Sequence, residues 1–288
     1  MTGRVWRAPW PLSLRGVLFP LRRGPHDPAF RITPDGAVWR TSWTPDGPGT
    51  LRIVRDGADF TGTAWGPGAG WLLDGMPALL GADDRPEEFV AHHDLVRESF
   101  AKHANWRIGR TDRVFEALVP AVLEQKVVGA EAWRAWGHLL RRFGEPAPGA
   151  PDMRVPPPRE VWAKIPSWEW HRSGAEAVRA RTIIQAARHD LESAPDRLRH
   201  LQGVGPWTIA EVRQRALGDP DALSVGDYHL PGQIGYALTG EKTDDAGMLR
   251  LLEPYTGQRY RAAVLILLEG KGPPRRGPRM SVRDYRSF

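Results

Sequence analysis

The amino-acid sequence predicts an α+β protein in which an N-terminal antiparallel β-rich domain precedes an all-helical domain. Residues 1 to about 90 contain short runs of β-branched and aromatic side chains, separated by clusters of glycine, proline and aspartate. After residue 90, apolar side chains recur at the spacing of amphipathic helices. We therefore divide the chain into a β-rich domain at 1–90, a helical domain at 91–270 and a basic tail at 271–288.

The individual strands and helices follow from these two periodicities. Strands are predicted at 37–43, 50–54 and 60–65, between turns at 33–36, 44–49 and 66–70. Helices are predicted at 112–123, 130–143, 176–191, 194–201, 228–238 and 258–268. Ser193 is the expected cap of the short helix at 194–201. The proline-rich stretch 145–159 is expected to be a linker or a surface loop.

Composition excludes several classes of site. The chain has no cysteine, which excludes disulfides, iron–sulfur clusters held by cysteine and cysteine-based zinc sites. No histidine–carboxylate spacing indicates a transition-metal site, no apolar run reaches membrane-spanning length, and the N-terminus lacks the core of a signal peptide. We therefore expect a cytoplasmic protein with no metal centre and no membrane partner.

The net charge of +6 is concentrated at the C-terminus. Six basic residues against one acid, Asp284, give residues 271–288 a charge of +5. The basic residues are Lys271, Arg275, Arg276, Arg279, Arg283 and Arg286. Because lysine and arginine displace counterions from phosphates, such a tail suggests a polyanion partner. A tail that only aids solubility is the alternative.

The most informative stretch is 201–211, with the sequence LQGVGPWTIAE. Gly203-Val204-Gly205 predicts a tight turn, and Pro206 suits the first position of a following helix, where its missing amide costs nothing. The glycines let bare backbone approach another molecule, and the free amides of the helix start attract anions. The pattern predicts contact with a nucleic-acid backbone. The alternative is a plain corner between two helices.

Residues 201–210, followed by VGDYHL at 225–230, resemble the signature of the helix-hairpin-helix (HhH-GPD) DNA glycosylase superfamily. Residues 116–143 resemble the helix pair that precedes the hairpin in that superfamily. The likeness is greatest to the 3-methyladenine DNA glycosylase II family, whose N-terminal domain is also a β-sheet, so it covers most of the chain. It implies a helix-hairpin-helix glycosylase domain in a nucleoid-associated monomer, with double-stranded DNA carrying a damaged base as its partner.

Asp227, twenty residues after Trp207, matches the catalytic carboxylate of this superfamily. Such a carboxylate stabilises the positive charge that develops on the sugar as the base leaves, and it can orient or deprotonate the attacking water. The alternative role is the cap of the following helix, and the two roles are compatible. Bifunctional members carry a lysine where this chain has Trp207, which implies a monofunctional enzyme that leaves an intact abasic site.

The resemblance assigns DNA contacts to the hairpin and to a loop that fills the gap left by a flipped base. The DNA-contacting residues of the hairpin are Gly203, Val204, Gly205 and Thr208. Gln125 matches the gap-filling position. Lys126 stands at the wedge position, where the family often has an apolar side chain, and could reach a phosphate instead. A surface Glu-Gln-Lys at a helix end is the alternative for both residues.

The base pocket implied by the resemblance contains Trp207, Glu211 and Tyr228. Trp207 matches an aromatic residue on which a cationic alkylated base can stack. Glu211 replaces a tyrosine, and it either pairs with such a base or forms an ion pair with Arg215 four residues on. We expect no cofactor, although the family's hairpin often holds a monovalent cation through backbone carbonyls.

These observations predict a monofunctional DNA glycosylase of base excision repair, acting on an alkylated base. One alternative is a catalytically inactive helix-hairpin-helix DNA-binding protein. Another is a glycosylase for oxidised or deaminated bases, which shares every backbone feature described above. A sequence-specific regulator built on a helix-turn-helix is a further alternative, and it predicts a preferred operator.

Overall fold

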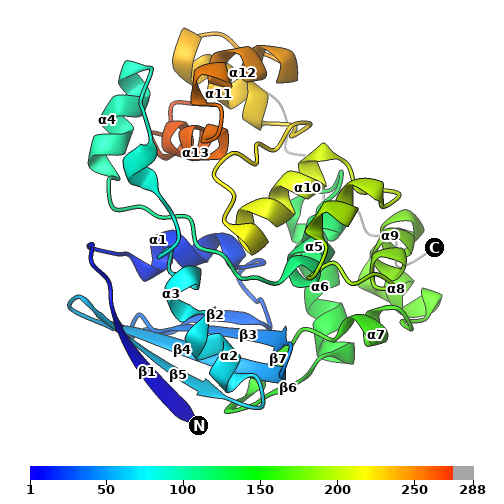
Figure 1. The fold of residues 1–288 in the computed structure, drawn as a ribbon. Helices are drawn as coiled ribbons and strands as arrows, with labels where there is room; N and C mark the ends of the chain where they lie inside the picture. The colour runs from blue at the N-terminus through cyan, green and yellow to red at the C-terminus, as the bar shows by residue number, and fades with distance from the viewer. Residues whose placement is uncertain (275–288) are drawn as a thin grey trace.

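The computed structural model describes residues 1–274, in which a five-stranded sheet is joined to two groups of helices (Figure 1). The strands are β1 (Thr2–Arg7), β2 (Phe30–Ile32), β3 (Val38–Thr44), β4 (Gly47–Asp56) and β5 (Asp59–Trp65). They are arranged in the order β1-β5-β4-β3-β2, with every neighbouring pair antiparallel. The α+β fold class is confirmed. The three predicted strands correspond to β3, β4 and β5, whereas β1 and β2 were not predicted.

Three short helices cover one face of this sheet. They are α1 (Leu14–Leu18), α2 (Ala69–Asp74) and α3 (Met76–Leu79). Because side chains alternate between the two faces of a strand, Leu51 and Ile53 of β4 point to the same side and pack there with Leu72 of α2. All three side chains are buried. This apolar layer is the core of the N-terminal region.

The other face of the sheet is covered by a segment that we expected to be a loop. Residues 145–159 contain a two-stranded hairpin, β6 (Glu145–Ala147) and β7 (Ala150–Val155), so the linker prediction is wrong there. Buried Met153 and Val155 pack with Trp39 and Trp43 of β3. The many prolines hid this hairpin because proline is compatible with short edge strands and strand ends.

The first group of helices surrounds α5. Its members are α5 (Val114–Leu123), α6 (Gly129–Phe143), α7 (Arg159–Trp162), α8 (Ser167–Ser173), α9 (Ala177–Ala186) and α10 (Pro206–Val212). A short π-helical segment, Arg213–Leu217, continues α10. Leu118 and Val122 of α5 are fully buried at the centre of the group. The helix is therefore held by its apolar side chains on all sides.

The second group consists of α4 (Asp94–Lys102), α11 (Leu230–Thr239), α12 (Asp245–Leu252) and α13 (Arg259–Leu268), and it has a core of its own. Figure 1 shows α4 beside α13, although they are far apart in the sequence. The Ser99 hydroxyl donates to the carbonyl of Leu265 at 2.7 Å. The region that we predicted as one helical domain thus contains two cores, and the chain crosses between them twice, at residues 103–113 and 218–229.

Two further features bear on the predictions from the sequence. Of the predicted basic tail, residues 275–288 lie outside the described part of the chain. Within residues 1–274, no helix has both the length and the apolar character needed to cross a lipid bilayer. The domain boundaries at 90 and 270 stay a proposal.

Candidate nucleic-acid interface and active site

The glycine turn lies between a 3₁₀ helix, η3 (Pro195–His200), and α10. Pro206 occupies the first turn of α10, as predicted. The expected cap is wrong, because the Ser193 hydroxyl donates to Asp190 at 2.7 Å instead of accepting a helix amide. The first intrahelical bond of α10 runs from the Ile209 amide to the Gly205 carbonyl at 3.0 Å. In this helix the amides of Trp207 and Thr208 precede Ile209 and have no intrahelical acceptor, and Thr208 is buried.

The two glycines of the turn have different structural roles. Gly203 has φ +83°, a left-handed conformation that other residues adopt at a cost. A Cβ atom built on Gly203 would lie 2.2 Å from Oγ1 of Thr182 in α9. Gly205 is exposed and extended, and a Cβ atom built there would meet nothing within 4 Å. Packing therefore explains the glycine at 203, whereas nothing within the described protein explains the one at 205.

Gln125 and Lys126 lie in the loop between α5 and α6. The Gln125 side chain donates to the Gly203 carbonyl at 2.9 Å and to the Thr208 hydroxyl at 2.8 Å. It thus ties the loop to the hairpin, and in this conformation it does not project outward to fill a gap. Lys126 is exposed and has φ +55°. Residues other than glycine rarely adopt this left-handed conformation, and the assignment of Gln125 and Lys126 to a DNA contact stays a proposal.

Asp227 is half-buried in the second segment that connects the two helical cores. Its Oδ1 accepts hydrogen bonds from the amides of His229 at 2.8 Å and Leu230 at 2.9 Å, at the start of α11. Its Oδ2 accepts a hydrogen bond from the indole nitrogen of Trp207 at 3.2 Å. The helix-cap alternative is therefore realised by Oδ1, while Oδ2 faces the hairpin helix.

The three residues predicted for a base pocket are placed very differently. Trp207 is half-buried beside Asp227. Tyr228 is 92% exposed, and its ring lies edge-on to the ring of His229. Glu211 accepts from the Ser224 hydroxyl at 2.7 Å and pairs with Arg215 at 2.7 Å. Both oxygens of Glu211 are engaged within the protein, which matches the alternative ion pair with Arg215.

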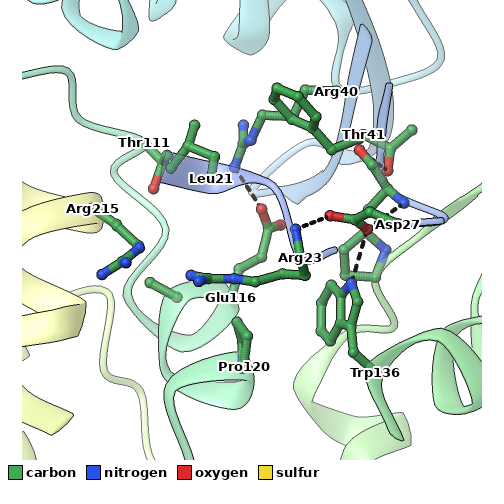
Figure 2. A pocket seen from close by; sticks show the side chains of 14 residues that line it. Leu21, Arg23, Asp27, Arg40, Thr41, Thr111, Glu116, Pro120, Trp136 and Arg215 are labelled. Atoms are coloured by element: carbon green, nitrogen blue, oxygen red, sulfur yellow. Dashed lines mark hydrogen bonds and ion pairs between the residues drawn. The ribbon is translucent and has the colours of Figure 1, made fainter. Parts of the chain in front are cut away.

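A small, partly open pocket lies between the sheet and the first helical group and is lined in part by Arg215 (Figure 2). Its volume is about 40 Å³, which has room for water but not for a nucleobase. Burial raises the pKa of Asp27, which accepts hydrogen bonds from the indole of Trp136 at 2.9 Å and from the amide of Arg23 at 2.6 Å. The Arg23 side chain extends toward Arg215 and pairs with Glu124 at 3.4 Å. These hydrogen bonds and this ion pair connect the N-terminal region to the first helical group, so the pocket has a structural role.

Several residues that hold the site in place were not predicted. Arg179 of α9 is buried and donates to the carbonyl of Gln125 at 2.9 Å, which supports the loop from below. The Asp245 carboxylate accepts from the amide of Gly226 at 3.0 Å, next to Asp227. A signal for Arg179 existed in the sequence, because it falls on the same helix face as the buried Ile183 and Ala186. No local signal pointed to Asp245.

A monovalent cation at the hairpin would bind backbone carbonyls. The carbonyls of Leu201 and Gly203 each accept one hydrogen bond, from the Val204 amide and from Gln125 respectively. A carbonyl oxygen has two lone pairs, so both retain the capacity to bind a cation. Within residues 1–274, the structure brings together no group of three histidine, aspartate or glutamate side chains that could hold a metal ion.

The fold is shared with solved DNA glycosylase structures. The chain superposes with a TM-score of 0.74 and 14% identity on the structure of MBOgg1 in complex with a low-affinity DNA ligand, covering 94% of this chain and 96% of that one. It superposes with a TM-score of 0.72 and 15% identity on 3-methyladenine DNA glycosylase from Archaeoglobus fulgidus, covering 93% and 98%. Clostridium acetobutylicum 8-oxoguanine glycosylase/lyase gives 0.69 and 11%, covering 90% and 91%. The chain thus has the fold of the helix-hairpin-helix DNA glycosylases.

Sequence comparison adds two curated relatives from Mycobacterium tuberculosis strains. Each is named "Probable bifunctional transcriptional activator/DNA repair enzyme AlkA" and is 29% identical over 167 residues. The match covers 53% of this chain and 34% of the relative, so the chain spans about a third of the relatives' length. No family model matches the sequence. The resemblance is confirmed at the level of the DNA glycosylase fold, which is shared by 3-methyladenine and 8-oxoguanine enzymes. The likeness to 3-methyladenine DNA glycosylase II stays a proposal.

Proposed function

We propose that this chain is a monofunctional DNA glycosylase of base excision repair, which acts as a monomer on double-stranded DNA and removes an alkylated base. The observation that carries the proposal is the position of Asp227. Asp227 lies in the second segment that connects the two helical cores. Its Oδ2 is next to the indole of Trp207, which belongs to the helix that starts at the glycine hairpin. The AlkA relatives, which are named as DNA repair enzymes, support the same class.

In the proposed reaction, the hairpin binds the phosphates of the damaged strand and the damaged nucleotide leaves the base stack. The bond between C1′ and the base nitrogen breaks, and its electron pair stays with the base. A purine alkylated at N3 or N7 is already cationic, so it leaves as a neutral molecule without a general acid. The sugar becomes positively charged, and the carboxylate of Asp227 stabilises that charge.

Water then adds to C1′ and its proton passes to Asp227 or to solvent, which leaves an abasic site in an intact strand. Two backbone amides and one indole N–H fix the orientation of the carboxylate before the nucleotide arrives. Such preorganisation lowers the reorganisation needed during the reaction. Because Trp207 stands at the position of the lyase lysine, no amine is available there to form a Schiff base.

The test is an excision assay on duplexes that each carry one lesion, from a panel of alkylated, oxidised and deaminated bases. We expect release of an alkylated base by the wild type, no release by Asp227→Asn, and strand cleavage only after treatment with alkali. Release of oxidised or deaminated bases alone would reassign the substrate class. Binding without release of any lesion would favour the inactive DNA-binding alternative, and a borohydride-trapped adduct would contradict the monofunctional reaction.

A further inference from the structure

A basic surface lies on α6. An open groove of about 700 Å³ runs along this helix, and Trp133, which is 39% exposed, forms part of its lining. The basic side chains that line it are His26, Arg134, His138, Arg141, Arg142 and Arg172, together with Arg23, which pairs with Glu124. Among the described residues that line the groove, none is acidic.

The basic residues on α6 share one face of the helix. Arg134, His138, Arg141 and Arg142 follow one another at helical spacing, opposite to the buried face that contains Trp136. A charged helix face is usually only solvated, but this face forms one wall of a groove. Arg172 from α8 and His26 from the loop before β2 complete it from the sides. Three separate segments of the chain therefore line one groove, and the exposed arginines among them come from α6 and α8.

A single buried carboxylate holds part of this surface in place. Glu169 is 5% exposed and lies 3.1 Å from Arg172, 3.7 Å from Arg142 and 3.5 Å from His138. The side chains of Arg142 and Arg172 nevertheless remain 64% and 65% exposed. One carboxylate offsets only one of these charges. The groove keeps a surplus of positive charge on side chains that are already ordered and accessible.

The groove begins beside the loop that we assigned to DNA. Ala130, its first residue on α6, is four residues after Lys126. From Ala130 to Arg142 the helix rises about 18 Å, at roughly 1.5 Å per residue. That length matches about five steps of duplex DNA, at roughly 3.4 Å per step. The size and the charge of the groove both fit a nucleic-acid backbone.

We propose that this groove binds the sugar–phosphate backbone of duplex DNA beyond the segment held by the hairpin, an inference that rests on the proposed function. Arg141 and Arg142 contact phosphates, and the groove extends the contact with DNA by about five base pairs on one side of the lesion. Its contribution is independent of sequence and sensitive to salt, because each neutralised phosphate releases condensed counterions.

The test measures binding of the full chain to a duplex with one central abasic-site analogue, over a series of salt concentrations. The variant is Arg141→Gln with Arg142→Gln. Its matched control is Arg7→Gln with Arg55→Gln, which removes the same charge from exposed positions on the sheet. We expect the slope of log K against log salt to become shallower by about 2 in the groove variant. The control should keep the wild-type slope.

A second measurement leaves the protein unchanged, so it holds even if the variant folds poorly. For the wild type, shortening one arm of the duplex by about five base pairs should make the slope of log K against log salt shallower by the same amount. Shortening the other arm should leave the slope unchanged. On the shortened duplex, the variant and the wild type should bind alike. Equal slopes for variant and wild type, or no effect of either arm, would refute the groove and leave the glycosylase proposal standing. If the slope changes as expected but no lesion is excised, the glycosylase proposal is refuted and the groove proposal stands.

Discussion

Alanine substitutions at the two hairpin glycines separate a structural role from a DNA-binding role. Gly203→Ala places a side chain on a left-handed residue and directly against Thr182, whereas Gly205→Ala adds a methyl group to an open, extended position. Both substitutions change the same three-residue turn by the same methyl group. Any difference in stability or DNA affinity between the two variants therefore depends on the surroundings of the added methyl group.

The expected loss of stability for Gly203→Ala can be estimated from the contacts. A left-handed alanine costs about 1–2 kcal/mol. The new Cβ would lie 2.2 Å from Oγ1 of Thr182, so Thr182 must rotate and break its hydrogen bond to the Val178 carbonyl, which costs about 1 kcal/mol more. The lower entropy of the unfolded alanine chain returns roughly 0.4–1 kcal/mol. The net loss is about 2 kcal/mol, or roughly 5 °C in melting temperature for a chain of this size.

Thermal unfolding and DNA binding together test this reasoning. Gly205→Ala should melt at the wild-type temperature or slightly above it, because only the unfolded-state term applies. Its affinity for a duplex with an abasic-site analogue should nevertheless fall at least about tenfold, or about 1.4 kcal/mol, since the methyl group blocks close approach of the phosphates. An unchanged melting temperature for Gly203→Ala would refute the packing argument. Full DNA affinity for Gly205→Ala would show that the turn does not touch the strand.

Three further predictions concern single side chains. Asp227→Asn should lower single-turnover excision by at least about a hundredfold with little change in DNA affinity, because only the charge that faces the sugar is lost; equal rates would refute its role. Lys126→Gly relieves the left-handed strain at φ +55°, so it should raise the free energy of unfolding by up to about 1 kcal/mol in chemical denaturation. The same variant should bind DNA more weakly than the wild type. A stable variant with full affinity would exclude Lys126 from the interface. Burial opposes ionisation of Asp221, but hydrogen bonds from Arg259 and from backbone amides outweigh it and lower its pKa. Its stabilising effect is therefore present above the unfolded-state pKa of about 3.9 and is lost as the pH falls through the lower folded value. Asp221→Asn should accordingly be less stable than the wild type at neutral pH, and the difference should shrink at strongly acidic pH in urea titrations; a constant difference would refute this linkage.

The hairpin could be predicted from the sequence because its determinants are local. Gly203 supplies the left-handed residue and Pro206 the first turn of α10, and both signals stand in the turn itself, although the contact of Gly203 with Thr182 does not. The position of Asp227 before α11 followed from the same kind of signal, a polar residue ahead of an apolar helical segment. The ion pair between Glu211 and Arg215 was one of two alternatives, and helical spacing alone could not choose between them.

The features that could not be predicted depend on long-range packing. Nothing near Met153 in the sequence shows that it packs against Trp39, so the hairpin formed by β6 and β7 was read as a loop. The side-chain direction of Gln125 was also unpredictable, because its two acceptors lie 78 and 83 residues away in the sequence. The left-handed backbone at Lys126 has no signature in residue type, since lysine has no preference for that region.

The two oxygens of Asp227 explain why a cap and a reactive carboxylate can be the same residue. Oδ1 is occupied by two amides of the α11 start, which fixes the helix to the carboxylate. Oδ2 accepts one N–H from Trp207, so it has lone-pair capacity left for a second partner. A residue that served only as a cap would need neither the indole nor a position between two helical cores. In the proposed reaction, the positive charge on the sugar would meet this free capacity of Oδ2, on the side of Asp227 that faces the hairpin helix.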